Sequence, residues 1–223
     1  MEIKSFQVSY NRARSQPAFL RINLIYRVGD FFQVKMQRRT ENIKLPEGNF
    51  KAELDWFENE DKVTLKNIYD QWIKLSNNLK KINSRAINIP EGLSEGAFAL
   101  AMGFGRFIKL IPQSSKANTS FDCYDLDNQK RIQVKASSIE KDTSSFGPRS
   151  VWDELYFVDF YKDGKWQGYY DIYLIPNHLI YGQKVNKSQT FTQQQSENRR
   201  PRFSIKNEII LTYNIKPIKT YKL

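Results

Sequence analysis

Residues 131–137 read RIQVKAS, and the interpretation of the whole chain depends on this stretch. In a β-strand, successive side chains point to opposite faces. Ile132, Val134 and Ala136 would then form one apolar face, as a core strand requires, while Gln133 and Lys135 would share the polar face. Folding alone does not call for that polar pair. We therefore expect Gln133 and Lys135 to serve the function of the protein.

The residues before this strand predict its hairpin partner. The stretch 119–138 reads TSFDCYDLDNQKRIQVKASS and has turn-forming residues at 126–130. Asp122, on the first arm, would lie beside Gln133 and Lys135 at one end of the sheet. A carboxylate and nearby backbone carbonyl groups, such as that of Val134, are oxygen ligands that suit magnesium. A lysine beside a metal ion can orient an attacking water, so this set suits metal-assisted phosphodiester hydrolysis.

Asp125 is an alternative to Asp122 as the acidic member of this set. It lies eight residues before Gln133, whereas Asp122 lies eleven residues before it. In a strand over 119–125 the two aspartates occupy opposite faces, and Asp125 is next to the turn. This alternation of side chains along the strand favours Asp122 over Asp125.

The charge of the chain is uneven. The 223 residues carry a formal net charge of +11. Residues 113–182 nevertheless hold ten acidic and eight basic side chains, whereas residues 183–223 hold two acidic and nine basic ones. Basic proteins attract polyanions by steering and counterion release. An acidic segment within a basic protein is therefore expected where a cation is held next to a bound polyanion.

Rare residue types exclude several classes of protein. The single cysteine, Cys123, excludes a disulfide framework and a cysteine-based zinc site, and it fits a reducing cytoplasm. The single histidine, His178, leaves little room for histidine-based hydrolases or histidine-ligated zinc enzymes. No apolar stretch is long enough to cross a membrane, and the first residues, MEIKSFQVSYNRARSQ, lack a signal sequence. We expect a cytoplasmic protein that does not bind membranes.

The element pattern predicts an α/β (α+β) fold with a mixed sheet. We expect an N-terminal β-rich subdomain over residues 1–60, a catalytic core over 61–182 and a basic C-terminal segment over 183–223. The first part has β-rich runs at 18–28 and 31–39, joined by a turn at 28–30, and the last has a strand near 207–215.

Residues 64–85 predict an amphipathic helix with Thr64 as its N-cap. Its apolar residues recur at steps of four and three, at Ile68, Trp72, Leu75, Leu79 and Ile82. A second helix is expected over 91–107, where small residues from Gly96 to Ala101 permit close packing. Two strands are expected at 154–161 and 168–175, with a turn at 162–165.

The hairpin resembles the PD-(D/E)xK nuclease motif, and residues 85–160 resemble type II restriction endonucleases. The resemblance implies a restriction-endonuclease-like core, a mixed sheet flanked by helices, and Mg²⁺-dependent cleavage of double-stranded DNA that leaves 5′-phosphate ends. It implies that Asp122 is the metal-binding aspartate and Lys135 the catalytic lysine. In this family an acidic residue from the preceding helix often joins the site, and here Glu91 and Glu95 are the candidates; Glu95 is preferred.

Gln133 departs from the motif, which usually has Asp or Glu at this position. The carbonyl oxygen of a glutamine can bind a metal but adds no negative charge. The expected metal site therefore consists of Asp122, Gln133, the Val134 carbonyl group and Glu95, with Glu95 supplying the second charge.

Two segments are candidates for DNA binding. Residues 190–206 are rich in arginine and glutamine, which read guanine and adenine when they reach base edges, or contact only phosphates. Residues 143–155, directly after the catalytic strand, either form a structural turn or touch the DNA backbone. The candidates are Gln194, Gln195, Asn198, Arg199, Arg200, Arg202, Ser145, Arg149 and Arg85.

The sequence thus favours a restriction endonuclease that acts as a homodimer, because two-fold protein symmetry matches palindromic sites. The resemblance also implies a cognate DNA methyltransferase. Two alternatives stay open: a repair or junction-resolving nuclease of the same fold, and a DNA-binding protein without catalysis, which the neutral Gln133 would fit.

Overall fold

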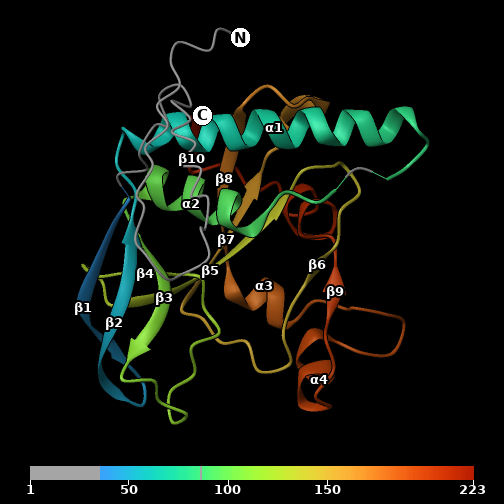
Figure 1. Cartoon of the computed structure of the whole chain (residues 1–223). Helices are drawn as coiled ribbons and strands as arrows, with labels where there is room; N and C mark the ends of the chain where they lie inside the picture. The colour runs from blue at the N-terminus through green and yellow to red at the C-terminus, as the bar shows by residue number, and fades with distance from the viewer. Residues whose placement is uncertain (1–35, 86) are drawn as a thin grey trace, which may run out of the picture. The chain divides into compact units, whose positions relative to one another are not determined.

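One long, mostly antiparallel sheet organises the molecule (Figure 1). The computed structural model describes residues 36–85 and 87–223. The sheet has eight strands in the order β1-β2-β3-β4-β5-β7-β8-β10. They are β1 (Gln37–Leu45), β2 (Gly48–Trp56), β3 (Gly105–Ile111), β4 (Cys123–Asp125), β5 (Lys130–Ser137), β7 (Glu154–Asp159), β8 (Tyr169–Ile175) and β10 (Lys219–Lys222). All neighbouring strands are antiparallel except β5 and β7, which are parallel. This mixed α+β arrangement confirms the expected fold class.

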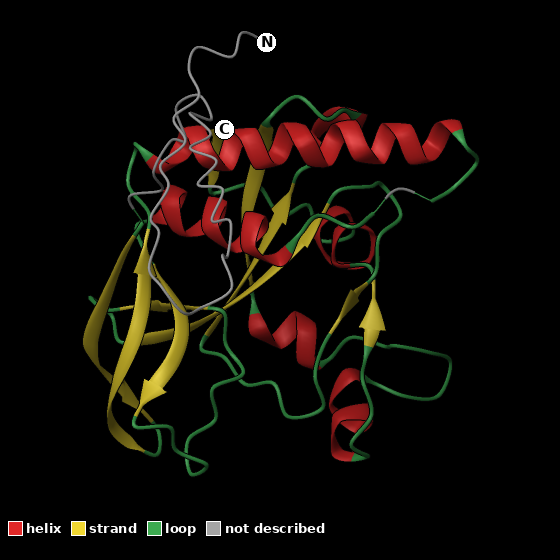
Figure 2. Ribbon diagram, in the orientation of Figure 1, coloured by secondary structure: helices red, strands yellow, loops and turns green. Residues whose placement is uncertain are grey.

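Two helices cover one face of the central strands (Figure 2). They are α1 (Asp61–Lys81) and α2 (Glu91–Met102). The small residues of α2 pack against the sheet as expected, since Ala97, Ala99 and Ala101 are buried in one core with Ile132 of β5. Gly96 also lets α1 come close, because an added Cβ would lie 3.0 Å from the Phe57 ring and 3.1 Å from the Leu65 side chain. Ile132 and Val134 of β5 are buried in the same core, so the apolar face expected for that strand is confirmed.

The predicted apolar face of α1 is only partly confirmed. Trp72 of the predicted stripe is buried and Leu79 is half-buried. Ile68 and Leu75 are instead 40% and 49% exposed, and Ile82, just beyond the helix, is 72% exposed. The helix buries Leu65 and Tyr69 in their place. Large aromatic side chains bury more area than aliphatic ones, and the Tyr69 hydroxyl also accepts a hydrogen bond from the Gly168 N–H at 3.1 Å. The Thr64 N-cap is wrong, because the helix begins at Asp61, which binds the Glu58 N–H.

Shorter elements build a second core on the opposite face of the sheet. These are β6 (Ser144–Ser145), α3 (Asn177–Tyr181), α4 (Phe191–Ser196), β9 (Arg202–Phe203) and a π-helix, η2 (Lys206–Leu211). The strand predicted near 207–215 is wrong, because these residues form η2, with Ile209 and Ile210 buried in this second core. The turn at 162–165 is confirmed as a 3₁₀ turn, η1 (Lys162–Gly164).

The β-rich N-terminal prediction falls partly outside the described residues. The runs at 18–28 and 31–35 lie there, while β1 and β2 pair with each other and continue through β3 into the main sheet. At the other end of the chain, β10 pairs with β8 in that same sheet. The division at residues 60 and 182 stays a prediction.

Candidate active site

The β4–β5 hairpin places Asp122 against the centre of β5, as predicted. Asp122 directly precedes β4, and its backbone N–H donates to the Ile132 carbonyl oxygen at 2.9 Å. Its carboxylate Oδ2 accepts hydrogen bonds from the Val134 backbone N–H at 2.7 Å and from the Gln133 side-chain amide. Backbone pairing therefore fixes the carboxylate beside Gln133 and Val134 of β5.

Gln133 is buried, with 2% of its surface exposed. Its amide nitrogen faces Asp122 and stabilises the ionised carboxylate. A rotation of the amide by 180° would present the carbonyl oxygen, a neutral metal ligand, at the same place. The side chain can thus act either as a donor to Asp122 or as a ligand beside it.

Lys135 lies on the same side of β5 as Gln133. Its ammonium nitrogen is 5.4 Å from the centre of the Phe146 ring, a cation–π contact on the face of the second core. Its positive charge lowers the pKa of both Asp122 and Glu95. The positive charge of Lys135 therefore acts on both carboxylates, and it favours the ionised form of each.

Glu95 comes from α2, and its side chain is 16% exposed. Its Oε2 accepts from the Arg106 Nε at 2.7 Å, and Arg106 also lies 3.9 Å from Asp55, a carboxylate that is 1% exposed. Burial raises the pKa of Glu95, while the hydrogen bond and charge of Arg106 lower it. Arg106 thus holds Glu95 in place, a contact that the sequence analysis missed and that only the β3–α2 packing reveals.

The electrostatics of the cluster favour a bound cation. Burial raises the pKa of Asp122 to about 7, the charge of Lys135 lowers it, and Glu95 and Glu91 raise it. When two buried carboxylates disfavour each other's ionisation, a metal ion bound between them strongly stabilises their ionised forms.

The donor set fits magnesium. Among the described residues, no group of three His, Cys, Asp or Glu side chains is arranged to hold a metal by itself. Asp122 and Glu95 would therefore need the Gln133 amide and the Val134 carbonyl group to complete a set of oxygen ligands. All four lie in or beside the hairpin and α2, and all four are the ligands predicted from the sequence.

Asp125 has a different role. Its carboxylate accepts hydrogen bonds from the N–H groups of Asp127 and Asn128 and from the Asn128 side chain. These bonds close the hairpin turn, which leaves Asp125 a structural part of the hairpin and supports the choice of Asp122.

The candidate DNA-binding residues do not gather in one place. Gln194 is buried, Gln195 donates to the Gly147 carbonyl oxygen, and Arg199 binds Gln189. Asn198 and Arg200 are exposed. The glutamines thus support the fold around α4, whereas the arginines beyond it stay accessible.

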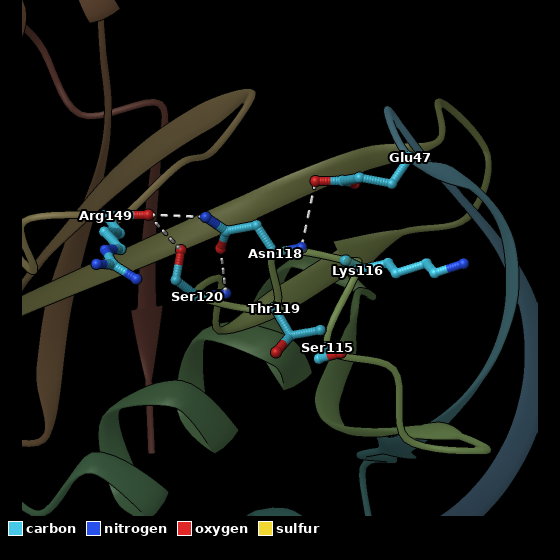
Figure 3. A pocket seen from close by; sticks show the side chains of 8 residues that line it. Glu47, Ser115, Lys116, Asn118, Thr119, Ser120 and Arg149 are labelled. Atoms are coloured by element: carbon cyan, nitrogen blue, oxygen red, sulfur yellow. Dashed lines mark hydrogen bonds between the residues drawn. The ribbon is translucent and has the colours of Figure 1, made fainter.

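Arg149 lies at a shallow hollow of about 440 Å³, together with residues of the loop that leads to Asp122 (Figure 3). The backbone oxygen of Arg149 accepts from the Asn118 side chain at 2.8 Å, and Glu47 accepts from the Asn118 N–H at 3.2 Å. The predicted turn role of residues 143–155 is therefore visible at Arg149, whose backbone ties this segment to the loop before Asp122.

Arg85, Ser145 and Arg202 do come together. They line a second hollow of about 700 Å³, and Ser145 pairs with Arg202 in the short β6–β9 ladder. Lys80 and Lys141, which the sequence analysis did not select, line it too.

A membrane span is absent from the described helices: each is too short or too polar to cross a bilayer.

Comparisons with known proteins identify the family of this chain. The model of the family described as Bsp6I restriction endonuclease matches residues 57–212. The type II restriction enzyme Bsp6I of Bacillus sp. (strain RFL6) is 33% identical over 156 residues, which cover 70% of this chain and 84% of that enzyme. No solved structure matches the chain significantly. The matched residues contain the whole hairpin, α2 and the β6–β9 ladder, and the chain therefore belongs to the Bsp6I restriction endonuclease family, a family of type II restriction endonucleases.

Proposed function

We propose that this enzyme cleaves double-stranded DNA at specific sequences with Mg²⁺ as its cofactor and leaves 5′-phosphate ends. The observation that carries the proposal is the position of the Asp122 carboxylate, bound by Val134 and Gln133 and within electrostatic reach of Lys135 and Glu95. Family membership supplies the reaction class. The cluster supplies an acidic pair and a cation in the arrangement that phosphodiester hydrolysis needs.

Each residue has a separate task in this proposal. Asp122 and Glu95 hold the metal, helped by Gln133 and the Val134 carbonyl group. Bound magnesium would stabilise the charge that develops on the phosphate. Lys135 orients the attacking water, and the Phe146 ring against its ammonium group limits where that group can point. Arg106 keeps the Glu95 carboxylate turned toward β3 by binding one of its two oxygens.

The proposal extends to assembly and biological context. A homodimer would present two such sites to a symmetric DNA sequence, and a cognate methyltransferase would protect the host's own copies of that sequence. A cytoplasmic location follows from the same role and fits the single, buried Cys123.

Incubation of the protein with phage DNA and Mg²⁺ tests the function. We expect discrete fragments with 5′-phosphate ends, their loss in Lys135→Ala, and unchanged fragments in Lys51→Ala, an exposed lysine on β2. Random or structure-dependent products would indicate a repair nuclease instead. Salt-sensitive binding without cleavage in Mg²⁺ or Mn²⁺ would indicate a DNA-binding protein.

A further inference from the structure

A basic cleft lies beside the catalytic cluster, and three of the residues predicted to bind DNA, Arg85, Ser145 and Arg202, line it. It is the hollow of about 700 Å³ between the C-terminal end of α1, the segment before α2, the residues between β5 and β6, and β9. Figure 1 shows β6 and β9 below that end of α1. Four exposed basic side chains and one carboxylate line the cleft, namely Lys80, Arg85, Lys141, Arg202 and Asp142.

In the described part of the chain, no ion pair neutralises the four cations of the cleft, although the Lys80 ammonium nitrogen lies over the Trp166 ring, 4.0 Å from its centre. Within residues 36–85 and 87–223, none of them lies within 4.0 Å of a carboxylate, although Asp142 shares the cleft. Elsewhere in the molecule Arg38, Arg131 and Lys206 each form an ion pair at 2.6–2.8 Å. Positive charges around one hollow repel each other, and a bound anion would offset that repulsion. The cleft therefore has the charge of an anion-binding site.

The cleft also offers an uncharged donor. The hydroxyl oxygen of Ser145 is buried and has no hydrogen-bond partner among the described residues. A buried polar atom of this kind costs free energy unless a bound group satisfies it. A phosphate oxygen in the cleft would accept from that hydroxyl, and the neighbouring Arg202, which faces Ser145 in the β6–β9 ladder, would supply charge.

Position connects the cleft to catalysis. Ser145 precedes Phe146, whose ring contacts the ammonium group of Lys135. On the opposite wall, Asn88 lies three residues before α2, the helix that carries Glu95. Both walls therefore continue directly into elements of the catalytic cluster.

We propose that this cleft binds backbone phosphates of duplex DNA next to the phosphate that is cleaved. The inference rests on the proposed nuclease function and adds a sequence-independent DNA contact to it. Lysine and arginine contacts to phosphates position a duplex without reading bases, so they contribute affinity but no sequence preference. All four basic residues lie within residues 57–212, the part of the chain that the family model matches.

Fluorescence anisotropy with a labelled 30-base-pair duplex of arbitrary sequence, without metal and across 50–200 mM salt, tests the proposal. The cleft variant carries Lys80→Gln, Arg85→Gln and Lys141→Gln. We expect the slope of log affinity against log salt to become shallower by about 3, and binding at 0.1 M salt to weaken on the order of 100-fold. The matched control carries Lys51→Gln, Lys74→Gln and Lys187→Gln, three exposed lysines away from the cleft that remove the same charge.

Asp142→Asn is a second variant, which removes a negative charge from the cleft instead of positive charges. It removes the one carboxylate that the described residues place in the cleft, so we expect tighter binding by a few-fold. It remains informative should the triple variant fail to fold. Equal losses in the cleft and control variants, or an unchanged salt slope in the cleft variant, would overturn the proposal, as would weaker binding by Asp142→Asn.

The outcomes separate this inference from the proposed function. Cleft-dependent duplex binding by a protein that does not cut DNA in Mg²⁺ would refute the nuclease and retain the DNA-binding cleft. Site-specific cleavage combined with unchanged binding in the cleft variant would refute the cleft and retain the nuclease.

Discussion

Asp122→Asn should stabilise the metal-free protein, although it removes a proposed metal ligand. The wild-type carboxyl group has its pKa raised from 3.8 to about 7 by burial, against the opposing charge of Lys135. An acid whose pKa is raised on folding contributes most stability when protonated, and that contribution is lost as pH rises through the folded pKa. Asparagine has no charge to bury, and its side-chain oxygen can still accept from the Val134 N–H. The variant thus keeps the contact and avoids the cost.

The raised pKa sets the magnitude. A shift from 3.8 to about 7 corresponds to at most about 4 kcal/mol above pH 7, and the part that appears between pH 5 and 8 is about 2–3 kcal/mol. For a chain of this length that difference moves the melting temperature by roughly 5–10 °C. Urea and thermal unfolding in EDTA at pH 5, 6.5 and 8 would measure it.

A matched control is Asp127→Asn, which changes an exposed carboxylate in the turn of the same hairpin. The stability of Asp127→Asn relative to wild type should not rise comparably with pH. A stability advantage of Asp122→Asn that stays constant from pH 5 to 8, or a loss of stability at pH 8, would refute the reasoning about burial.

Three further outcomes follow from the same cluster and its helix. Glu95→Ala should reduce Mg²⁺-dependent cleavage at least 100-fold and leave metal-free DNA binding intact. Glu91→Ala, an exposed change on the same helix, should keep the cleavage rate within about threefold of wild type. Equal losses of cleavage in both variants would contradict the assignment of Glu95. Gln133→Glu restores a second strand carboxylate, so half-maximal cleavage should need several-fold less Mg²⁺, whereas the metal-free protein should melt at a lower temperature because two buried carboxylates then repel. Gly103→Ala should lower the free energy of unfolding in urea by about 1 kcal/mol. Gly103 ends α2 at φ 75°, a conformation that a Cβ disfavours. An unchanged free energy of unfolding would show that the backbone can adjust there.

The catalytic hairpin could be predicted because its signal is local. Alternation in β5 fixes which side chains share a face, and the turn at 126–129 fixes the pairing, so Asp122 and Gln133 meet wherever the hairpin packs. The choice of Asp122 over Asp125 came from the same alternation, and the hydrogen bonds of Asp125 within the turn agree with it.

Features that depend on distant packing were not predictable in this way. The sequence of α1 offers two apolar stripes, and the one that is buried contains Tyr69, whose hydroxyl binds Gly168 ninety-nine residues away. The apolar run at 207–215 has strand-like composition, yet Ile209 and Ile210 fill the second core only when the backbone forms η2. Arg106 carries no sequence signal, because its importance comes from the packing of β3 against α2.

The parallel pairing of β5 and β7 has a consequence for how this enzyme could change its DNA contacts. Parallel neighbours cannot be joined by a tight turn, so residues 138–153 must cross over the face of the sheet to return the chain to the start of β7. This single crossover carries Lys141, Asp142 and Ser145 to one hollow, Arg149 to the other, and Phe146 to Lys135. Insertions or substitutions within it would remodel both hollows, including the proposed DNA-binding cleft. The hydrogen bond between Asp122 and Val134, which belongs to the hairpin alone, would stay intact.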